Sequence, residues 1–508
     1  MTHLYDNLKA YETAIAKLRS HPEDLDSKHA AVLALARAGS LDFALTEYAR
    51  FGLNDIRHHE DIMSLGGRLY KDLYLSHTGK EAQQFARLSA DKYEAAYQDT
   101  GGFYSGINAA TMSLLGGIPE EMIKMRAERL LENLPAISNN DQDVYFTEAS
   151  RAEAHLLLGD EHDAWASLKR ALNYDPLNFA AHASTLKQFA MIARARGKEI
   201  SWLSDFTPPC AVHFSGHMFG LENEVKTVPV LSKDEIEGLK NKISNLIQTH
   251  DIGFGSGALA AGADIMIAEG LLEEGGELHV VLPVEKQIFI DISVAPFGAS
   301  WVPRFEACLA QARSVKIFED RSEWPDITLI RRASLMAMGG AVRRSDALAV
   351  NAGQLVIWDG KDGVYGTAQD VTLWKNSGRM QHIIPYSAPR QPSPYSADGS
   401  PFHCEVYLGQ DGSDAAEIKP TPIEAIKKAL KARRDKADLI QMIAIKLSDS
   451  SSQNSSNLLH EAGNLPGVIY LNELAANYIA IHHDADFAIS YMGQNQQGCR
   501  IFALQERG

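Results

Sequence analysis

From residue 1 to about residue 200, apolar side chains recur every three or four positions, which is the spacing of one face of an α-helix. Ala, Leu, Glu and Lys dominate this stretch, proline is scarce and runs of β-branched residues are absent. Such residues favour helix because their side chains lose little rotamer freedom there. The pattern predicts an all-helical domain over residues 1–204.

Part of this region has the layout of a tetratricopeptide repeat. From Gly159 to Pro176, small residues occupy the positions where two helices must touch, and the proline ends the second helix. A weaker copy begins at Gly39, and another lies within residues 93–110. No regular period of about 34 residues emerges, so an ordinary helical bundle remains an alternative.

The pattern changes at Pro208-Pro209. Short apolar runs rich in β-branched and aromatic residues then alternate with amphipathic helical stretches. The runs are residues 210–214, 278–282, 314–318, 354–358 and 380–384. This alternation predicts a parallel sheet with helices on both faces, a Rossmann-like α/β domain over residues 205–388.

The remaining chain divides at a Pro- and Ser-rich stretch. Residues 389–402 are expected to form a linker, and residues 403–508 a smaller α+β domain in which the polar stretch 448–456 forms an exposed loop. The predicted fold class is multidomain: an all-α tetratricopeptide-like solenoid, then an α/β Rossmann-like parallel sheet, then a small α+β domain. A chain of 508 residues is too long for one hydrophobic core, which agrees with this division.

Glycine-rich segments follow the predicted strands of the middle domain. The first strand runs into Ser215-Gly216-His217, at the end of the strand where open α/β sheets bind ligands. Gly255-Ser256-Gly257 comes next, followed by Gly262 and Asp264 at the start of a helix. Glycine lets the backbone approach a phosphate closely, and a helix N-terminus offers unpaired N–H groups. These segments are equally consistent with tight structural turns.

A second glycine-rich turn strengthens the case for a ligand site. It follows the strand at residues 355–358 and contains Asp359, Gly360, Gly363, Gly366 and Thr367. Two such turns in one parallel sheet can face each other across a crevice. One would hold phosphate through backbone N–H groups, and the other would hold ribose through carboxylate and hydroxyl groups.

The middle domain resembles the SLOG superfamily, the Rossmann-like group that includes DprA and the Lonely Guy phosphoribohydrolases. The residues that carry the resemblance are Ser215-Gly216-His217, the Gly-Ala-Asp-Ile segment at 262–265, the strand at 278–283, and Trp358-Asp359-Gly360 with Gly366-Thr367. The resemblance covers about residues 208–386. It implies binding of a nucleotide or a nucleotide-derived ligand.

The hydrolase fingerprint of that superfamily, P-G-G-x-G-T-x-x-E, persists only in part. Gly363, Gly366 and Thr367 remain, the proline is missing, and Asp370 stands where the glutamate would act. The resemblance therefore favours a sensor without turnover. In the alternative, Asp370 serves as a carboxylate base with Arg343 or Arg344 as the phosphate partner.

Two further resemblances concern the flanking domains. Residues 65–73 and 104–111 are similar to the TRAF-binding region of MAP kinase kinase kinases, which implies a protein-interaction or self-assembly surface. Residues 465–473 and 501–504 resemble the tail of a class III nucleotide cyclase domain. Ser455 and Leu459 stand where that family's Asn and Arg would be, so this domain is expected to be a degenerate, inactive cyclase-like unit.

Charge and composition narrow the partners. The chain has 49 basic and 65 acidic side chains, a formal charge of −16, without a Lys/Arg block that could follow a phosphate backbone. Nucleic acid and anionic membranes are therefore not expected as partners. The N-terminus lacks the layout of a leader, and no run of about 18 apolar residues occurs, so we expect a cytoplasmic protein.

Metal and disulfide chemistry are not expected. The four cysteines are scattered singly, which argues against a zinc ribbon or a disulfide framework. His213 and His217 straddle a predicted strand and turn, so they do not share a helical face as a zinc motif requires. No metal site and no required cofactor are predicted, apart from the nucleotide-derived ligand.

The sequence thus predicts an intracellular signalling or defence component. Its middle domain would sense a nucleotide-derived ligand, and its repeats would relay this to a protein partner or a second copy. The first alternative is a hydrolase that cleaves the N-glycosidic bond of a nucleotide with Asp370. The second is a protein-interaction scaffold that binds no small molecule.

Overall fold

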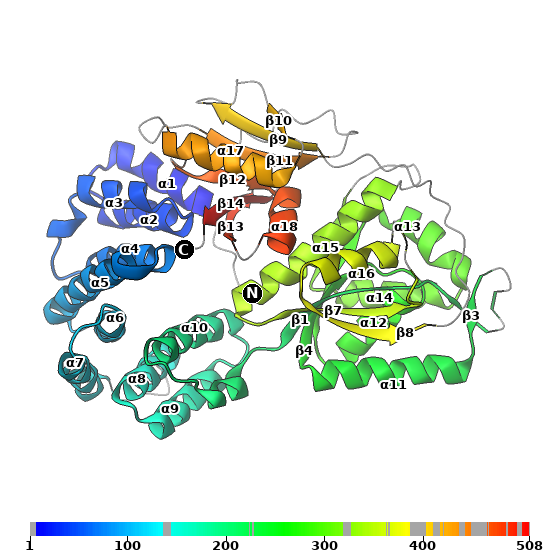
Figure 1. The fold of residues 1–508 in the computed structure, drawn as a ribbon, viewed down its shortest axis with the longest axis horizontal. Helices are drawn as coiled ribbons and strands as arrows, with labels where there is room; N and C mark the ends of the chain where they lie inside the picture. The colour runs from blue at the N-terminus through cyan, green and yellow to red at the C-terminus, as the bar shows by residue number, and fades with distance from the viewer. Residues whose placement is uncertain are drawn as a thin grey trace.

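The computed structural model describes residues 7–135, 144–222, 224–225, 228–318, 327–361, 363, 366–386, 403–409, 417–419, 421–435, 442–448, 465, 467–483, 486–494 and 500–506. Within these residues the chain forms a helical region, a parallel sheet covered by helices and a small C-terminal α+β unit (Figure 1). This is the fold class predicted from the sequence. The expected linker at 389–402, most of the loop at 448–456, and both Ser455 and Leu459 lie outside the described residues.

The helical region consists of helices that follow one another along an arc in Figure 1. They are α1 (Asn7–Ser20), α2 (Leu25–Arg37), α3 (Leu41–Arg50), α4 (Glu60–Ser76), α5 (Gly79–Thr100), α6 (Phe103–Leu115), α7 (Glu120–Asn133), α8 (Val144–Leu158), α9 (Glu161–Tyr174) and α10 (Phe179–Ala195), with the short 3-10 helices Leu53–Asp55 and Ser201–Phe206. Asp160 and Asn178 cap α9 and α10 by accepting hydrogen bonds from backbone N–H groups.

Small residues set the spacing between these helices. A Cβ atom on Gly67 of α4 would lie 2.6 Å from the ring of Tyr93 on α5. One on Gly106 of α6 would lie 2.9 Å from the ring of Tyr97 and from Leu130. Only glycine allows the helices to approach this closely, so close packing accounts for Gly106.

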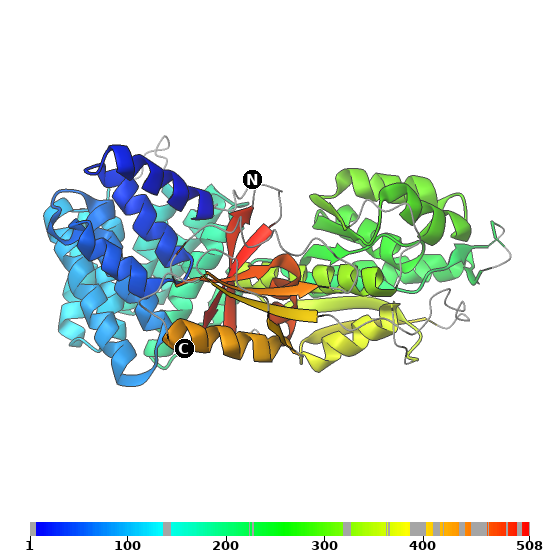
Figure 2. The ribbon, with the colours of Figure 1, turned by 90° about the horizontal axis from the view of Figure 1, so that it is seen from above.

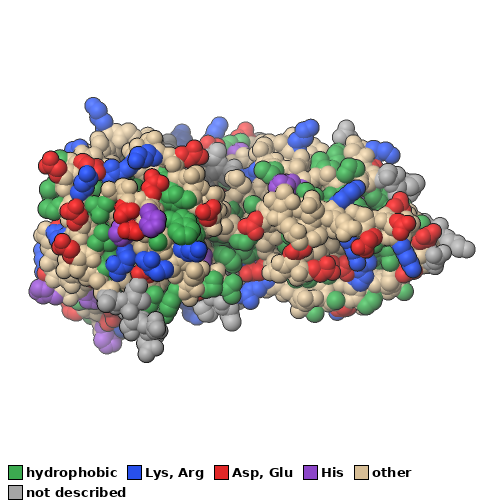
Figure 3. Space-filling model, turned by 90° about the horizontal axis from the view of Figure 1, so that it is seen from below, with side chains coloured by type: hydrophobic (Ala, Val, Ile, Leu, Met, Phe, Trp, Pro, Cys, Tyr) green, Lys and Arg blue, Asp and Glu red, His purple; other side chains and the backbone are tan. Residues whose placement is uncertain are grey.

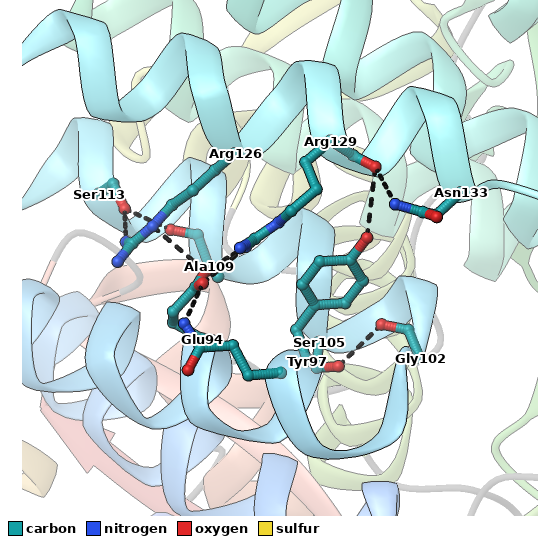
Figure 4. A network of polar contacts seen from close by, with 10 residues as sticks. Glu94, Tyr97, Gly102, Ser105, Ala109, Ser113, Arg126, Arg129 and Asn133 are labelled. Atoms are coloured by element: carbon teal, nitrogen blue, oxygen red, sulfur yellow. Dashed lines mark hydrogen bonds and ion pairs between the residues drawn. The ribbon is translucent and has the colours of Figure 1, made fainter.

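A buried ionic network joins α5, α6 and α7 (Figure 4). Glu94 on α5 accepts a hydrogen bond from Arg129 at 2.6 Å and pairs with Nε of Arg126 at 3.2 Å. Arg126 also donates to the hydroxyl of Ser113 on α6, and the Arg129 guanidinium lies over the ring of Tyr97. The Glu94 carboxylate therefore has partners on α7 that offset the cost of its burial.

The middle unit is built on a six-stranded parallel sheet. Its strands lie in the order β6 (Ser314–Ile317), β5 (Glu277–Leu282), β4 (Ile252–Gly257), β1 (Cys210–Gly216), β7 (Ala352–Trp358) and β8 (Met380–Pro385). Helices α11 (Lys233–Thr249), α12 (Ala263–Glu273), α13 (Lys286–Ser293) and α14 (Trp301–Gln311) share one core with the sheet. Helices α15 (Ile327–Leu348) and α16 (Gly366–Asn376) cover the opposite face. Two short strands, β2 (Gly220–Leu221) and β3 (Val230–Leu231), pair beside the sheet.

Strand β4 was not anticipated. The glycine-rich pattern of residues 253–257 predicts a loop, whereas these residues form a central strand between β1 and β5. Glycine has low strand propensity, so the local pattern gives no strand signal. Here the missing side chains make room for Phe214: a Cβ atom on Gly257 would lie 2.6 Å from both its ring and its carbonyl oxygen.

The C-terminal unit is a mixed, mostly antiparallel sheet with two helices. The strands lie in the order β10 (Glu417–Lys419), β9 (His403–Gly409), β11 (Met442–Ser448), β12 (Ile469–Asn472), β14 (Arg500–Glu506) and β13 (Phe487–Gln494). Only β11 and β12 pair in parallel among these described strands. Helices α17 (Pro422–Asp435) and α18 (Glu473–His482) complete the unit.

The C-terminal sheet lies between the other two units, as Figure 2 shows. Alternate residues of β12 and β14 point to its two faces. On one face, Tyr470, Met492 and Ile501 share a core with α2, α3 and α4 of the helical region. On the other face, Phe502 shares a core with Met338 of α15. Each face of this sheet is therefore buried against a different unit.

The helical region also contacts the middle unit directly. Lys187 on α10 donates to the backbone carbonyl of Asp346 at the end of α15, at 2.9 Å. Phe179 on α10 packs edge to face on Phe254 of β4, with ring centroids 5.7 Å apart. The three units thus contact one another pairwise and form a closed arrangement.

The surface carries charges of both signs. On the face drawn in Figure 3, acidic and basic side chains are interspersed over both lobes. No described helix combines the length and the apolar character that crossing a bilayer would require.

Candidate functional site

The strand order contains one switch point, between β1 and β7. From β1 the chain moves outward through β4, β5 and β6, and then returns to place β7 on the other side of β1. The connections that leave the carboxyl ends of β1 and β7 therefore go to opposite faces of the sheet, the arrangement at which open α/β sheets bind their ligands. The carboxyl ends of β1 and β7 are called the crevice below. Ser215 and Gly216 end β1 at this point, and Asp359 follows β7.

Hydroxyl and carboxyl groups from three elements meet there. The hydroxyl of Ser215 on β1 lies 3.4 Å from that of Thr367 in the first turn of α16. One turn later, Oδ2 of Asp370 accepts a hydrogen bond from the hydroxyl of Ser334 on α15 at 3.2 Å. Burial raises the pKa of Asp370 to about 7, while its hydrogen bonds to Ser334 and Ser215 oppose that rise.

Asp264 provides a second buried carboxyl group at the switch point. It is the second residue of α12, and its Oδ2 accepts a hydrogen bond from the backbone N–H of Ala260 at 3.3 Å. Burial raises the pKa of Asp264 to about 7; the Asp370 charge adds to the rise, and the backbone amides of Ala260 and Gly216 oppose it. Its Oδ1 is buried and has no hydrogen-bond partner among the described residues. Two carboxyl groups of raised pKa, coupled to each other, are typical of functional sites.

His217 and Asp359 connect the two sides of the crevice. Nε2 of His217, just after β1, lies 3.2 Å from Oδ1 of Asp359, just after β7. The His217 ring also packs against Tyr386, with ring centroids 5.1 Å apart. His217 is thus held by a carboxylate and an aromatic ring.

Two of the predicted glycines are explained by close backbone approach. A Cβ atom on Gly216 would overlap that of Ala263, so glycine lets the start of α12 contact the end of β1. Gly262 has φ 95°, and a Cβ atom there would lie 2.8 Å from the backbone nitrogen of Phe219. Both glycines are required by the turn that delivers Asp264 to the crevice.

Gly255, Ser256 and Gly257 lie within strand β4 and not on a loop. A Cβ atom on Gly255 would lie 2.6 Å from Leu271 of α12. Ser256 is buried on the opposite face, near Gly340 of α15. Packing accounts for this segment, and the structure provides no phosphate-binding loop there.

The glycines after β7, unlike those of β4, are not explained by close packing. Gly360 and Gly366 have φ of 76° and 59°, and a Cβ atom on either would meet nothing within 4 Å. Gly363 is exposed, and the side chain of Asp359 accepts a hydrogen bond from the backbone N–H of Lys361 at 3.1 Å. Gly360 and Gly366 thus have open space beside them, and Gly366 begins α16, where helical N–H groups favour anions.

Arg343 and Arg344 are not brought to the carboxyl cluster. Nε of Arg343 donates to Oδ1 of Asn477 on α18 at 3.0 Å, at the interface with the C-terminal unit. Arg344 pairs with Glu277, at the amino end of β5, at 2.8 Å. Helix α15 runs from Ser334 beside Asp370 toward the amino end of the sheet, so residues 343 and 344 lie two to three turns from the crevice. The predicted pairing of Arg343 or Arg344 with Asp370 is therefore wrong.

Two glutamines that were not predicted as site residues position α16. Nε2 of Gln354 on β7 donates to Nδ1 of His213 at 3.0 Å and to the backbone carbonyl of Asp370 at 3.2 Å. Gln381 on β8 donates to Gln354 and to the backbone carbonyl of Val371, each at 2.8 Å. Two glutamines in predicted strands are the only sequence signal, because a buried amide requires a polar partner.

Packing accounts for the position of His213, and two of the cysteines are free thiols. His213 stacks on Trp374, and burial lowers its pKa to about 3. Cys210 and Cys308 are free thiols. Within the described part of the chain, the search for clustered metal-ligating groups finds His155, Asp160 and Asp163 on the surface of the helical region. Asp160 caps α9 there, which accounts for its position.

A comparison with protein families identifies the repeats. The model of the family described as Tetratricopeptide Repeats-Sensor matches residues 5–113. The N-terminal region is a tetratricopeptide-repeat region. The match ends before the segment from Gly159 to Pro176, which has the repeat layout described above. Repeats of this kind form protein-interaction surfaces, which gives the chain a repeat-based signalling or protein-interaction role.

Comparison with individual proteins adds little. No curated protein matches the chain. Among solved structures, a tetratricopeptide-repeat protein of Thermus thermophilus is 14% identical, with a TM-score of 0.28 over 37% of this chain and 88% of that one. A mutant O-GlcNAc transferase of Thermobaculum terrenum is 15% identical, with a TM-score of 0.18 over 76% and 60%. LpoA of Haemophilus influenzae is 11% identical, with a TM-score of 0.16 over 76% and 70%.

Proposed function

We propose that this protein is a signalling component that binds a nucleotide or a nucleotide-derived ligand at the β1–β7 switch point and relays the binding to its tetratricopeptide repeats. The observation that supports the ligand site is the convergence there of Ser215, Thr367, Asp370 and Asp264 from separate elements. Polar groups gathered at the carboxyl end of a parallel sheet are the usual basis of a nucleotide site.

The chemistry of the two turns fits such a ligand. There is open space around Gly360 and Gly366, and Gly366 begins α16, whose first N–H groups suit a phosphate. The hydroxyl and carboxyl groups deeper in the crevice suit sugar hydroxyls, which both donate and accept hydrogen bonds. A nucleotide has both a phosphate and a sugar. Its phosphate would lie at Gly360 and Gly366, and its sugar at the hydroxyl and carboxyl groups.

Helix α15 offers a physical route from this site to the rest of the chain. Ser334 contacts Asp370 at the site, and Arg343 contacts Asn477 of the C-terminal unit on the same helix. Arg379, just before β8, donates to the backbone carbonyls of Ala480 and Ile481 at the end of α18. A shift of α15 on ligand binding would therefore move α18.

The C-terminal sheet continues the route to the repeats. Tyr470 and Met492 share a core with the first helices of the repeat region, and Gln505 donates to the backbone carbonyl of Arg37 at 3.2 Å. Packed cores transmit small shifts because they are dense and have little room to deform. Ligand binding would thus alter the presentation of the repeats to a protein partner or a second copy.

Calorimetry of the full chain with ATP, NAD, ADP-ribose and cyclic nucleotides tests the ligand site. We expect saturable binding of at least one of them, lost or weakened at least tenfold in Thr367→Val. The matched control is Thr372→Val on the same helix, whose hydroxyl binds the backbone carbonyl of Ala368 and should leave affinity unchanged. Absence of binding by folded protein across the panel would support the scaffold alternative instead.

The hydrolase alternative rests on a separate observation. A carboxyl group whose pKa is near 7 can accept a proton from water at neutral pH, and both Asp370 and Asp264 have such a pKa. In N-glycosidic hydrolysis, the oxygen of water bonds to C1′ of the ribose while its proton passes to the carboxylate. The C1′–N bond breaks with its electron pair on the nucleobase, which then takes that proton from the carboxyl group and leaves. Mass spectrometry of each calorimetry mixture decides between the functions. Cleaved ligand with the native chain and intact ligand with Asp370→Asn would establish the enzyme, whereas intact ligand throughout would leave the sensor.

A further inference from the structure

The three contacts between the units differ in size and in character. The C-terminal sheet shares a hydrophobic core with each of its neighbours, through Met492 on the repeat side and Phe502 on the side of the middle unit. The contact between α10 and the middle unit is smaller, and its buried members are Ala211, Phe254 and Leu348. Large apolar interfaces fix two units relative to each other, whereas small ones allow them to move. The α10 contact is therefore the place where the closed arrangement can open.

An aromatic pair forms the apolar part of this contact. Phe179, at the start of α10, is partly buried and packs edge to face on Phe254 of β4, with the ring centroids 5.7 Å apart. The guanidinium carbon of Arg344 lies 4.4 Å from the centroid of the same Phe254 ring. Arg344 is itself paired with Glu277 at 2.8 Å. The middle unit therefore holds Phe254 in place by its own contacts, and undocking of α10 would withdraw only Phe179 from this pair.

A lysine forms the polar part of the contact. Lys187, about two turns after Phe179 on α10, donates from Nζ to the backbone carbonyl of Asp346 at 2.9 Å. Asp346 lies in the last turn of α15, where the carbonyl groups of a helix end attract cations. This hydrogen bond is exposed, so water competes with it. It orients α10 on α15 but adds little stability.

The end of α15 is held in a strained conformation at the same place. Leu348, its last residue, belongs to the core of the contact, and Ala349 follows with φ 58°. A non-glycine residue in this left-handed region costs free energy and persists only where its surroundings hold it. The contact with α10 is part of these surroundings. We therefore expect the end of α15 to loosen when α10 leaves.

We propose that α10 is a latch. Its contact with Phe254 and the end of α15 keeps the three units in their closed arrangement, and its release opens that contact while both faces of the C-terminal sheet stay buried. Residues 196–209 connect α10 to β1 and limit the extent of the opening. The latch meets β1 near its amino end, at Ala211, whereas the candidate ligand site lies at the carboxyl end of the same strand. The latch thus goes beyond the proposed function and does not depend on it.

Hydrogen exchange and small-angle X-ray scattering of the full chain test the latch. In the double variant Phe179→Ala, Lys187→Gln we expect exchange at least tenfold faster in α10 and at residues 345–350, together with a larger radius of gyration. Strands β12 and β14 should keep native rates, because their two faces stay buried. The matched control is Leu177→Ala, Lys198→Gln, which changes an apolar and a basic side chain that are both exposed. It should match the native chain in both measurements.

Two results would overturn the latch. A native radius of gyration in the double variant would show that the units stay closed without this contact, and faster exchange confined to α10 would show a local packing role. If the double variant does not fold, Lys187→Gln alone provides a second route, because it leaves every core side chain in place. It should accelerate exchange at residues 345–350 at least threefold, and unchanged exchange there would contradict the proposal.

Discussion

Nε of Arg343 on α15 donates a hydrogen bond to Oδ1 of Asn477 on α18 at 3.0 Å, beside the point where Gly339 brings the two helices into contact. The Nδ2 group of Asn477 donates to the Sδ atom of Met336 and to the backbone carbonyl of Glu473, at 2.9 Å each. Burial lowers the pKa of Arg343 to about 10. This contact joins the helix that touches the candidate site to the C-terminal unit.

The helix crossing predicts a size limit at residue 339. A Cβ atom there would lie 2.7 Å from Cα of Asn477, so Gly339→Ala should separate the helices and lower the free energy of unfolding by about 1–3 kcal/mol. In Gly340→Ala the new Cβ atom would meet only Oγ of Ser256, at 3.5 Å, and the gain in helix propensity is the same. Urea denaturation would compare the two variants, and equal stability would show that the crossing tolerates a methyl group.

The two buried carboxyl groups predict a pH dependence of stability. The pKa of Asp264 and that of Asp370 are about 7 in the folded chain, against about 4 for an unfolded aspartate. The folded state therefore binds more protons between these values, and stability falls as pH rises from 4 through 7. Asp370→Asn removes one of these titrations.

As pH rises from 5 to 8, the free energy of unfolding of Asp370→Asn should increase by about 1–3 kcal/mol relative to that of the native chain. Thermal unfolding of both proteins across this range measures the difference. The exposed control Glu237→Gln should follow the native chain at every pH. A constant difference between native and Asp370→Asn would mean that Asp370 titrates normally in the folded state.

The ionic network of the repeats predicts a local loss of stability. Glu94 is 8% exposed and pairs with Arg126 and Arg129, so Glu94→Gln would leave two guanidinium groups without their carboxylate. We expect a loss of about 3 kcal/mol, measured by urea denaturation. The loss should persist in high salt because the pair is largely buried. Glu132→Gln, an exposed acid on α7, is the control and should change stability little.

The core between the repeats and the C-terminal sheet predicts coupled unfolding. Met492 on β13 is fully buried against the first helices, so Met492→Ala should cost about 2–5 kcal/mol. Because the core is shared, hydrogen exchange should accelerate in α2 and α3 as well as in β13 and β14. Phe146→Ala, at a side chain that is 52% exposed, should leave these rates unchanged. Faster exchange confined to the C-terminal strands would show that the two units open independently.

The sequence by itself determined the order of the units and most of their elements. Helical spacing predicted the N-terminal helices, and five apolar runs predicted β1, β5, β6, β7 and β8. Burial on both faces explains the apolar runs of the inner strands β1, β5 and β7, whereas β6 and β8 are edge strands with exposed apolar side chains. The sequence placed Ser215 at the end of β1, and Thr367 and Asp370 after the turn that follows β7, and the topology then brought them together.

Other features were decided only by the tertiary structure. Periodicity shows which face of an element is buried but not against what, so the shared cores on both faces of the C-terminal sheet had no sequence signal. Strand β4 depends on the ring of Phe214 filling the space above its glycines. Arg343 and Arg344 belong to the same unit as Asp370, yet helix α15 carries them toward Asn477 and Glu277, because the partner of a charged side chain is set by the fold.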